Sequence, residues 1–154
     1  IRIKESVNYI SVGFGSSYGD PYNAVVAINW VDKLSQLGIR TFAMSDTVGV
    51  AKPDTIKYIF DNLLKEFNDL SIGAHFHSNA LSWEEKIQAA YDSGCRRYDS
   101  ALKGIGGCPM AKDDLVGNIA TENILGWCEQ QNLPLNINKE AFSEAMMMAS
   151  EIFV

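Results

Sequence analysis

The chain alternates short apolar runs with amphipathic stretches, and this pattern predicts a repeated strand and helix unit. Apolar runs rich in β-branched and aromatic residues are typical of buried strands, whereas apolar side chains spaced three and four residues apart indicate helices. The unit recurs four times in the 154 residues. Strands are expected at 9–14, 40–44, 70–75 and 96–101, helices at 23–37, 53–67, 83–93 and 121–131, and a final Met-rich helix at 141–153.

Local signals mark where several of these helices begin and end. Pro53 stands in the expected first turn of the second helix, where its missing N–H is not needed. Ser82 and Thr121 are expected to cap the third and fourth helices. Gly38 and Gly94 are expected to end the first and third, because glycine readily adopts the left-handed conformation.

Strands alternating with helices at this spacing predict a parallel sheet with right-handed crossovers. Two α/β architectures compete for it. A flavodoxin-like, doubly wound domain fits the length, whereas an eight-stranded (β/α)8 TIM barrel needs about 250 residues, so four units would be a half-barrel. The polar residues favour the barrel, because they follow the strands, where barrel enzymes build their active sites. They are Asp46-Thr47, His75, His77 and the segment 103–118.

Composition narrows the function classes. The net charge of −6 argues against nucleic acid and anionic membrane surfaces as partners, since both call for clustered Lys and Arg. No apolar run approaches the roughly 20 residues that span a bilayer. Three cysteines without a spaced framework favour a reducing compartment, so a cytoplasmic location is expected. By length, residues 1–154 are expected to form a single domain.

His75 and His77 are the strongest candidates for chemistry. Residues two apart on a strand point to the same face, so one divalent ion can be held between the two imidazoles. The segment that follows adds a thiol at Cys108 and a carboxamide at Asn118. The alternative is that the two histidines have no functional role and are polar residues on a solvent-facing strand.

Three stretches carry a family resemblance: 45–50 (SDTVGV), 73–77 (GAHFH), and 101–109 (ALKGIGGCP) continuing to Gly117-Asn118. Together they resemble the 3-hydroxy-3-methylglutaryl-CoA lyase family. The Gly-Cys-Pro form of the loop resembles the lyases, whereas the related synthases carry Gly-Glu-Arg there. The resemblance implies a TIM barrel, of which this chain would be the C-terminal half, strands five to eight plus a C-terminal helix.

The resemblance also implies a set of site residues. His75, His77 and Asn118 match three of the family's ligands to Mg²⁺ or Mn²⁺, and the fourth, an aspartate, would lie in the other half of the barrel. Cys108 would be a thiol acid/base, and Asp46 an acid/base or a positioning residue. Their alternatives are a buried small side chain and a turn cap. Ser78-Asn79 departs from the Asp-Thr or Asn-Asp that is common in the family.

The activity that the resemblance implies is metal-dependent retro-Claisen cleavage of 3-hydroxy-3-methylglutaryl-CoA to acetoacetate and acetyl-CoA. An acyl-CoA is then the substrate, and another copy or a complementary N-terminal half-barrel is the expected partner. The alternatives are a related acyl-CoA aldolase or synthase and a catalytically inactive half-barrel module. A doubly wound flavin or nucleotide domain is disfavoured, because the glycine-containing segment 13–19 does not open directly into a helix.

Overall fold

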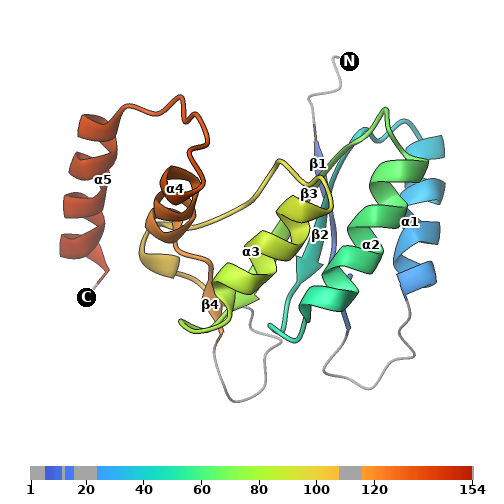
Figure 1. Cartoon of the computed structure of the whole chain (residues 1–154), viewed down its shortest axis with the longest axis horizontal. Helices are drawn as coiled ribbons and strands as arrows, with labels where there is room; N and C mark the ends of the chain where they lie inside the picture. The colour runs from blue at the N-terminus through green and yellow to red at the C-terminus, as the bar shows by residue number, and fades with distance from the viewer. Residues whose placement is uncertain (1–5, 12, 16–23, 108–115, 154) are drawn as a thin grey trace.

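A computed structural model describes residues 6–11, 13–15, 24–107 and 116–153 (Figure 1). Its strands are β1 (Val7–Ile10), β2 (Thr41–Asp46), β3 (Ser71–Ser78) and β4 (Gly117–Asn118). Its helices are α1 (Ala24–Gln36), α2 (Pro53–Glu66), α3 (Trp83–Asp92), α4 (Thr121–Gln130) and α5 (Lys139–Ile152), with a 3-10 turn, η1, at Leu102–Gly104. Within the described residues, no helix is long and apolar enough to cross a membrane.

The sheet has the strand order β1-β2-β3-β4, with β1, β2 and β3 parallel. Strands adjacent in the sequence are therefore adjacent in the sheet, and α2 packs between α1 and α3 along it (Figure 1). A doubly wound sheet requires a reversal of strand order, which this order lacks. The expected α/β half-barrel is consistent with the arrangement, and the flavodoxin-like alternative is wrong.

The predicted strand at 96–101 is only a pair of isolated bridges. The Ala74 N–H donates to the Arg97 carbonyl and the Asp99 N–H donates to the Ala74 carbonyl, both at 2.9 Å, so the segment does run parallel to β3. By Ala101 it has left β3 and pairs with Ala120 instead. The end of β3 pairs with β4, which is antiparallel and too short to be predicted from periodicity.

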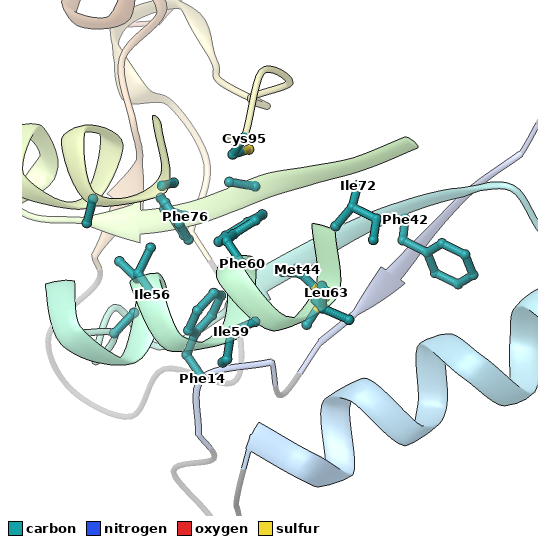
Figure 2. Close-up of a cluster of buried hydrophobic side chains, with 14 of the residues drawn as sticks. Phe14, Phe42, Met44, Ile56, Ile59, Phe60, Leu63, Ile72, Phe76 and Cys95 are labelled. Atoms are coloured by element: carbon teal, nitrogen blue, oxygen red, sulfur yellow. The ribbon is translucent and has the colours of Figure 1, made fainter. Parts of the chain in front are cut away.

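The hydrophobic core lies between the strands and α2 (Figure 2). The ring of Phe76 meets that of Phe14 at 5.5 Å and that of Phe60 at 6.5 Å, both edge to face. Because strand side chains alternate, the helix-facing position of Phe76 turns its neighbours His75 and His77 to the opposite face of β3. This is the face that would line the interior of a barrel.

Several helix boundaries follow the predicted signals. Pro53 is the first residue of α2, and Gly38 and Gly94, with φ of 93° and 96°, follow the ends of α1 and α3. Ser82 precedes α3 as expected, but its side chain does not cap the helix. The Asn79 carboxamide oxygen instead accepts the N–H groups of Leu81 and Ser82 in the turn before α3.

The last two helices begin differently from expectation. Ala120, not Thr121, holds the N-cap position of α4. α5 starts at Lys139, two residues earlier than predicted, because the Asn138 side chain accepts hydrogen bonds from the first N–H groups of the helix.

Candidate active site

The two histidines of β3 and an asparagine of β4 meet on one face of the sheet. The ring centroids of His75 and His77 are 5.2 Å apart. Asn118 is the register partner of His77 in the antiparallel β3–β4 pair, so their side chains project to the same side. The structure thus brings together the three residues that the sequence suggested as metal ligands.

The orientation of His77 is fixed by a backbone carbonyl. Its Nδ1 lies 3.1 Å from the Val116 carbonyl oxygen, which can only accept a hydrogen bond. This contact assigns the proton to Nδ1 and leaves the lone pair on Nε2 for a ligand. Metal-binding histidines commonly use one nitrogen for the metal and the other for such a carbonyl.

Asn118 is held by the backbone that follows η1. Its Nδ2 donates to the carbonyl oxygens of Ile105 at 2.9 Å and Gly106 at 3.3 Å, so Oδ1 is the atom left for a cation. Gly106 has φ of 95°, and a Cβ there would come within 2.9 Å of the same Nδ2. The absence of a side chain at Gly106 therefore allows this close approach.

His75 is partly buried between polar and aromatic neighbours. Its Nδ1 lies 3.5 Å from Oδ2 of Asp99, and the Tyr9 ring meets the imidazole edge to face at 5.3 Å. Burial first, and the neighbouring His77 second, lower the pKa of His75, while Asp99 acts in the opposite direction. His75 is therefore neutral near neutral pH, which is the form that binds metal.

These three donors fit a hard divalent cation only in part. Two imidazoles and one carboxamide oxygen occupy three positions of an octahedron, without the carboxylate that Mg²⁺ or Mn²⁺ usually takes from its protein. No group of three His, Cys, Asp or Glu side chains within 6–11, 13–15, 24–107 and 116–153 is arranged to hold a metal. The three donors therefore suit part of the coordination shell of such a cation, and a further carboxylate would complete it.

A pocket of about 250 Å³ opens beside Asn118, and neither His75 nor His77 lines it. It lies between the end of β3, η1 and the start of α4, and Asn118 is part of its wall together with Trp83, Lys103 and Asn123. The Lys103 ammonium donates to the Phe153 carbonyl at 3.3 Å. Asp99 lies away from Lys103 and faces His75 and Arg97.

Asp46 is buried at the end of β2, with both carboxylate oxygens in use. Oδ1 accepts the Val50 N–H at 2.8 Å, and Oδ2 accepts the Ala51 N–H at 3.0 Å and the Lys86 ammonium at 2.7 Å. This geometry favours the positioning role over proton transfer, because an acid/base has to reach the reacting atoms. The acid/base role of Asp46 stays a prediction.

The Cys108 thiol lies outside the described residues, so its acid/base role also stays a prediction. Next to it in the sequence, Gly107 pairs with Gly117 in an antiparallel bridge. The bridge therefore places Gly107, the described residue before Cys108, close to Asn118.

Comparison with known proteins identifies the family. The family model described as HMGL-like matches residues 2–148. The chain belongs to the HMGL-like family. Hydroxymethylglutaryl-CoA lyase of Bacillus subtilis is 29% identical over 143 residues, which are 93% of this HMGL-like chain and 48% of the relative. An (R)-citramalyl-CoA lyase of Chloroflexus aurantiacus is 29% identical over 149 residues, 94% of this chain and 47% of that enzyme.

Solved structures give the same fold. The crystal structure of the Bacillus subtilis HMG-CoA lyase matches 94% of this chain and 48% of its own chain, with a TM-score of 0.84 and 29% identity. An HMG-CoA lyase of Acinetobacter baumannii, in complex with coenzyme A and 3-methylmalate, matches 88% of this chain and 44% of its own with a TM-score of 0.78 and 31% identity. The HMGL-like chain is thus a partial TIM barrel that spans about half the length of these carbon–carbon lyases.

Sequence analysis missed Lys86, which joins Asp46 to the histidine strand. Its ammonium also donates to the carbonyl oxygens of Gly49 and His77, both at 2.9 Å. The sequence contained a signal for this role, because Lys86 lies on the apolar face of α3, one turn before Ala90 and next to Ile87. All three residues are buried. A lysine at such a position calls for a buried anionic partner.

Proposed function

We propose that this HMGL-like chain carries half of the active site of a divalent-metal-dependent lyase that cleaves 3-hydroxy-3-methylglutaryl-CoA. The observation that carries the proposal is the alignment of His75, His77 and Asn118 on one face at the end of β3. Each has a ligand atom left over after its structural contact, and the pocket beside Asn118 offers space for part of a substrate. Mg²⁺ or Mn²⁺ is the cation that suits such oxygen and imidazole donors.

The reaction is a retro-Claisen cleavage between C2 and C3 of the acyl chain. The C3 hydroxyl loses its proton, the C3 carbon becomes the ketone of acetoacetate, and the bonding electrons pass to the thioester as an enolate. That enolate takes a proton at carbon and leaves as acetyl-CoA. A bound divalent cation supplies polarisation of the substrate oxygens.

The residues of the chain have three proposed roles, which are metal binding, proton transfer and positioning. His75, His77 and Asn118 would hold the cation. The Cys108 thiol transfers a proton at the reacting carbon or hydroxyl, as the Gly-Cys-Pro loop of the family implies. Asp46 holds the loop after β2 and, through Lys86, the carbonyl of His77.

The rest of the barrel, supplied by a complementary N-terminal half or another copy, is the proposed partner. Val7 and Tyr9 of β1 lie on the same face as His75 but are 44% and 49% exposed. On the outer layer, Trp30 and Leu37 are 51% and 78% exposed. Exposed apolar side chains on the edge strand β1, on α1 and just after it support the proposal that further strands and helices cover this surface.

The described cysteines, Cys95 and Cys128, are free thiols. They support a reducing compartment, and a cytoplasmic location is part of the proposal.

Citramalyl-CoA is a second candidate substrate, because the (R)-citramalyl-CoA lyase is as similar to this chain as the hydroxymethylglutaryl-CoA lyase is. Both thioesters carry a tertiary hydroxyl on C3 and a terminal carboxylate, and both release acetyl-CoA when the same bond breaks. Citramalyl-CoA is shorter by one methylene and leaves pyruvate instead of acetoacetate. The keto acid therefore tells the two activities apart.

The test is acetyl-CoA release by a complete barrel. The chain is joined to the first half of the Bacillus subtilis lyase, and each thioester is supplied with Mg²⁺ or with EDTA. We expect Mg²⁺-dependent acetyl-CoA and acetoacetate, and loss of both products in His77→Ala. A folded hybrid that releases no acetyl-CoA from either thioester contradicts the proposal and favours an inactive half-barrel module, whereas pyruvate from citramalyl-CoA alone would reassign the substrate.

A further inference from the structure

We propose that Asp99 is a positioning residue that accepts the Nδ1 proton of His75 and so presents Nε2 to the cation. The inference rests on the proposed metal site, and it adds a residue that neither the motifs nor the family match singles out. Its basis is a chain of contacts from β2 through Arg97 to Asp99 and then to His75.

The contact between Asp99 and His75 is nearly a hydrogen bond. Oδ2 of Asp99 and Nδ1 of His75 are 3.5 Å apart, both atoms are buried, and neither has a hydrogen-bond partner among the described residues. Buried polar atoms are seldom left unpaired, and a shift of roughly 0.5 Å would bring these two to ordinary hydrogen-bond distance. A carboxylate can only accept, so the imidazole proton would lie on Nδ1.

Asp99 is held in place from the other side. Its Oδ1 lies 3.3 Å from Nη1 of Arg97, whose Nη2 donates to the Phe42 carbonyl of β2. The guanidinium crosses β3 at Gly73, where a Cβ would come within 2.7 Å of Cζ and Nε. Gly73 therefore makes the space in which Arg97 can fix one carboxylate oxygen and leave the other to His75.

The two histidines of the site are then oriented in the same way, each by an oxygen acceptor at Nδ1. Nδ1 of His77 faces the Val116 carbonyl, and Nδ1 of His75 faces the Asp99 carboxylate. With both Nδ1 atoms turned to acceptors, both Nε2 atoms are available to one cation. A histidine whose second nitrogen donates to a carboxylate or a carbonyl is the usual arrangement around protein-bound metals.

Tyr9 is the competing partner of the same carboxylate. The pKa of its phenol is raised, first by burial and second by a hydrogen bond to Asp99. If the Tyr9 hydroxyl, held by Asp99, were itself the acceptor of the His75 proton, the Nδ1 tautomer of His75 would be lost when the hydroxyl is removed. Tyr9→Phe, which keeps the ring beside His75, separates the two possibilities.

The first measurement is the tautomer of His75, read from long-range ¹H–¹⁵N correlations of the metal-free chain at about pH 8, where imidazoles are neutral. We expect His75 to carry its proton on Nδ1 in the unmodified chain and in Tyr9→Phe. In Asp99→Ala the proton should shift towards Nε2, with Asp99→Asn intermediate. Asp69→Ala, which removes an exposed carboxylate paired with Arg40, is the matched control and should leave His75 unchanged.

The second measurement is Mn²⁺ affinity by electron paramagnetic resonance. We expect Asp99→Ala to bind Mn²⁺ roughly 10- to 100-fold more weakly than Asp69→Ala. Gly73→Ala should also lower the Mn²⁺ affinity, because the new Cβ would displace the Arg97 guanidinium that holds Asp99. This variant keeps Asp99 and serves as the test if Asp99→Ala does not fold.

The outcomes separate the inference from the proposed function. An Nε2 proton on His75 in the unmodified chain, or an Asp99→Ala variant with unchanged tautomer and affinity, overturns the role of Asp99. Loss of the Nδ1 proton in Tyr9→Phe assigns the effect to Tyr9 and also overturns it. No Mn²⁺ binding by the unmodified chain contradicts the metal site itself, while the tautomer still decides whether Asp99 orients His75.

Discussion

The Lys86 ammonium lies 2.7 Å from the Asp46 carboxylate, and both side chains are almost fully buried, at 2% and 0% exposed. The pair joins α3 to the end of β2. Lys86 also reaches the carbonyl of His77, so the same ammonium connects the loop after β2 to the strand that carries the histidines. A single buried cation thus aligns two neighbouring strand ends of the candidate site.

Replacing Lys86 by methionine should destabilise the fold strongly. The variant leaves a buried carboxylate without its counter-ion, which typically costs about 3–5 kcal/mol of unfolding free energy. Asp69→Asn is the control, because the Arg40–Asp69 pair is exposed at 63% and 66% and such pairs contribute about 0–1 kcal/mol. Urea denaturation measures both, and similar losses in the two variants would contradict the structural role of Lys86.

Alkaline pH should weaken the fold through Cys95 and Tyr98. Burial raises the pKa of the Cys95 thiol above its ordinary 9.0 and raises that of the Tyr98 phenol above 10.0. The folded chain keeps protons that the unfolded chain releases, so stability is fully present below the unfolded pKa and declines as pH rises past about 9. Urea denaturation against pH should show this decline reduced in Cys95→Ala, and a decline of equal size in Cys95→Ala would count against it.

The sequence was most informative where a local pattern decides the structure. Periodicity predicted the three parallel strands and the helices between them, and the His-x-His pattern placed both imidazoles on one face. The contacts around the site depend instead on residues far apart in the chain, such as Lys86 with Asp46. Arg97 could not be anticipated, because its position depends on the space above Gly73. The two-residue β4 has no periodicity to detect.

Gly106→Ala should weaken metal binding without removing a ligand. The new Cβ would meet Nδ2 of Asn118 at 2.9 Å, at a backbone φ of 95° that alanine disfavours. Asn118 should therefore turn away from His77, and we expect the Mn²⁺ affinity to fall by about 10-fold. Gly126→Ala is the control, because a Cβ there meets nothing within 4 Å. An unchanged Mn²⁺ affinity in Gly106→Ala would show that Asn118 is not a ligand.

Cys108→Ala should separate proton transfer from metal binding in the complete barrel. A thiol that transfers a proton but holds no cation should, when removed, lower kcat by roughly 10² to 10⁴ and leave Mn²⁺ affinity nearly unchanged. Steady-state release of acetyl-CoA measures the first quantity and paramagnetic resonance the second. Normal turnover with metal bound would leave Cys108 as a packing residue.

The position of a bound cation decides whether His75, His77 and Asn118 form one metal site. Crystals of the complete barrel soaked in Mn²⁺ would locate it by anomalous diffraction, independently of any substrate. We expect one peak within roughly 2–2.5 Å of Nε2 of His75, Nε2 of His77 and Oδ1 of Asn118, at distances typical of such ligands. A peak that lies away from these atoms, or a histidine pair whose Nε2 atoms diverge with Mn²⁺ bound elsewhere, would contradict it.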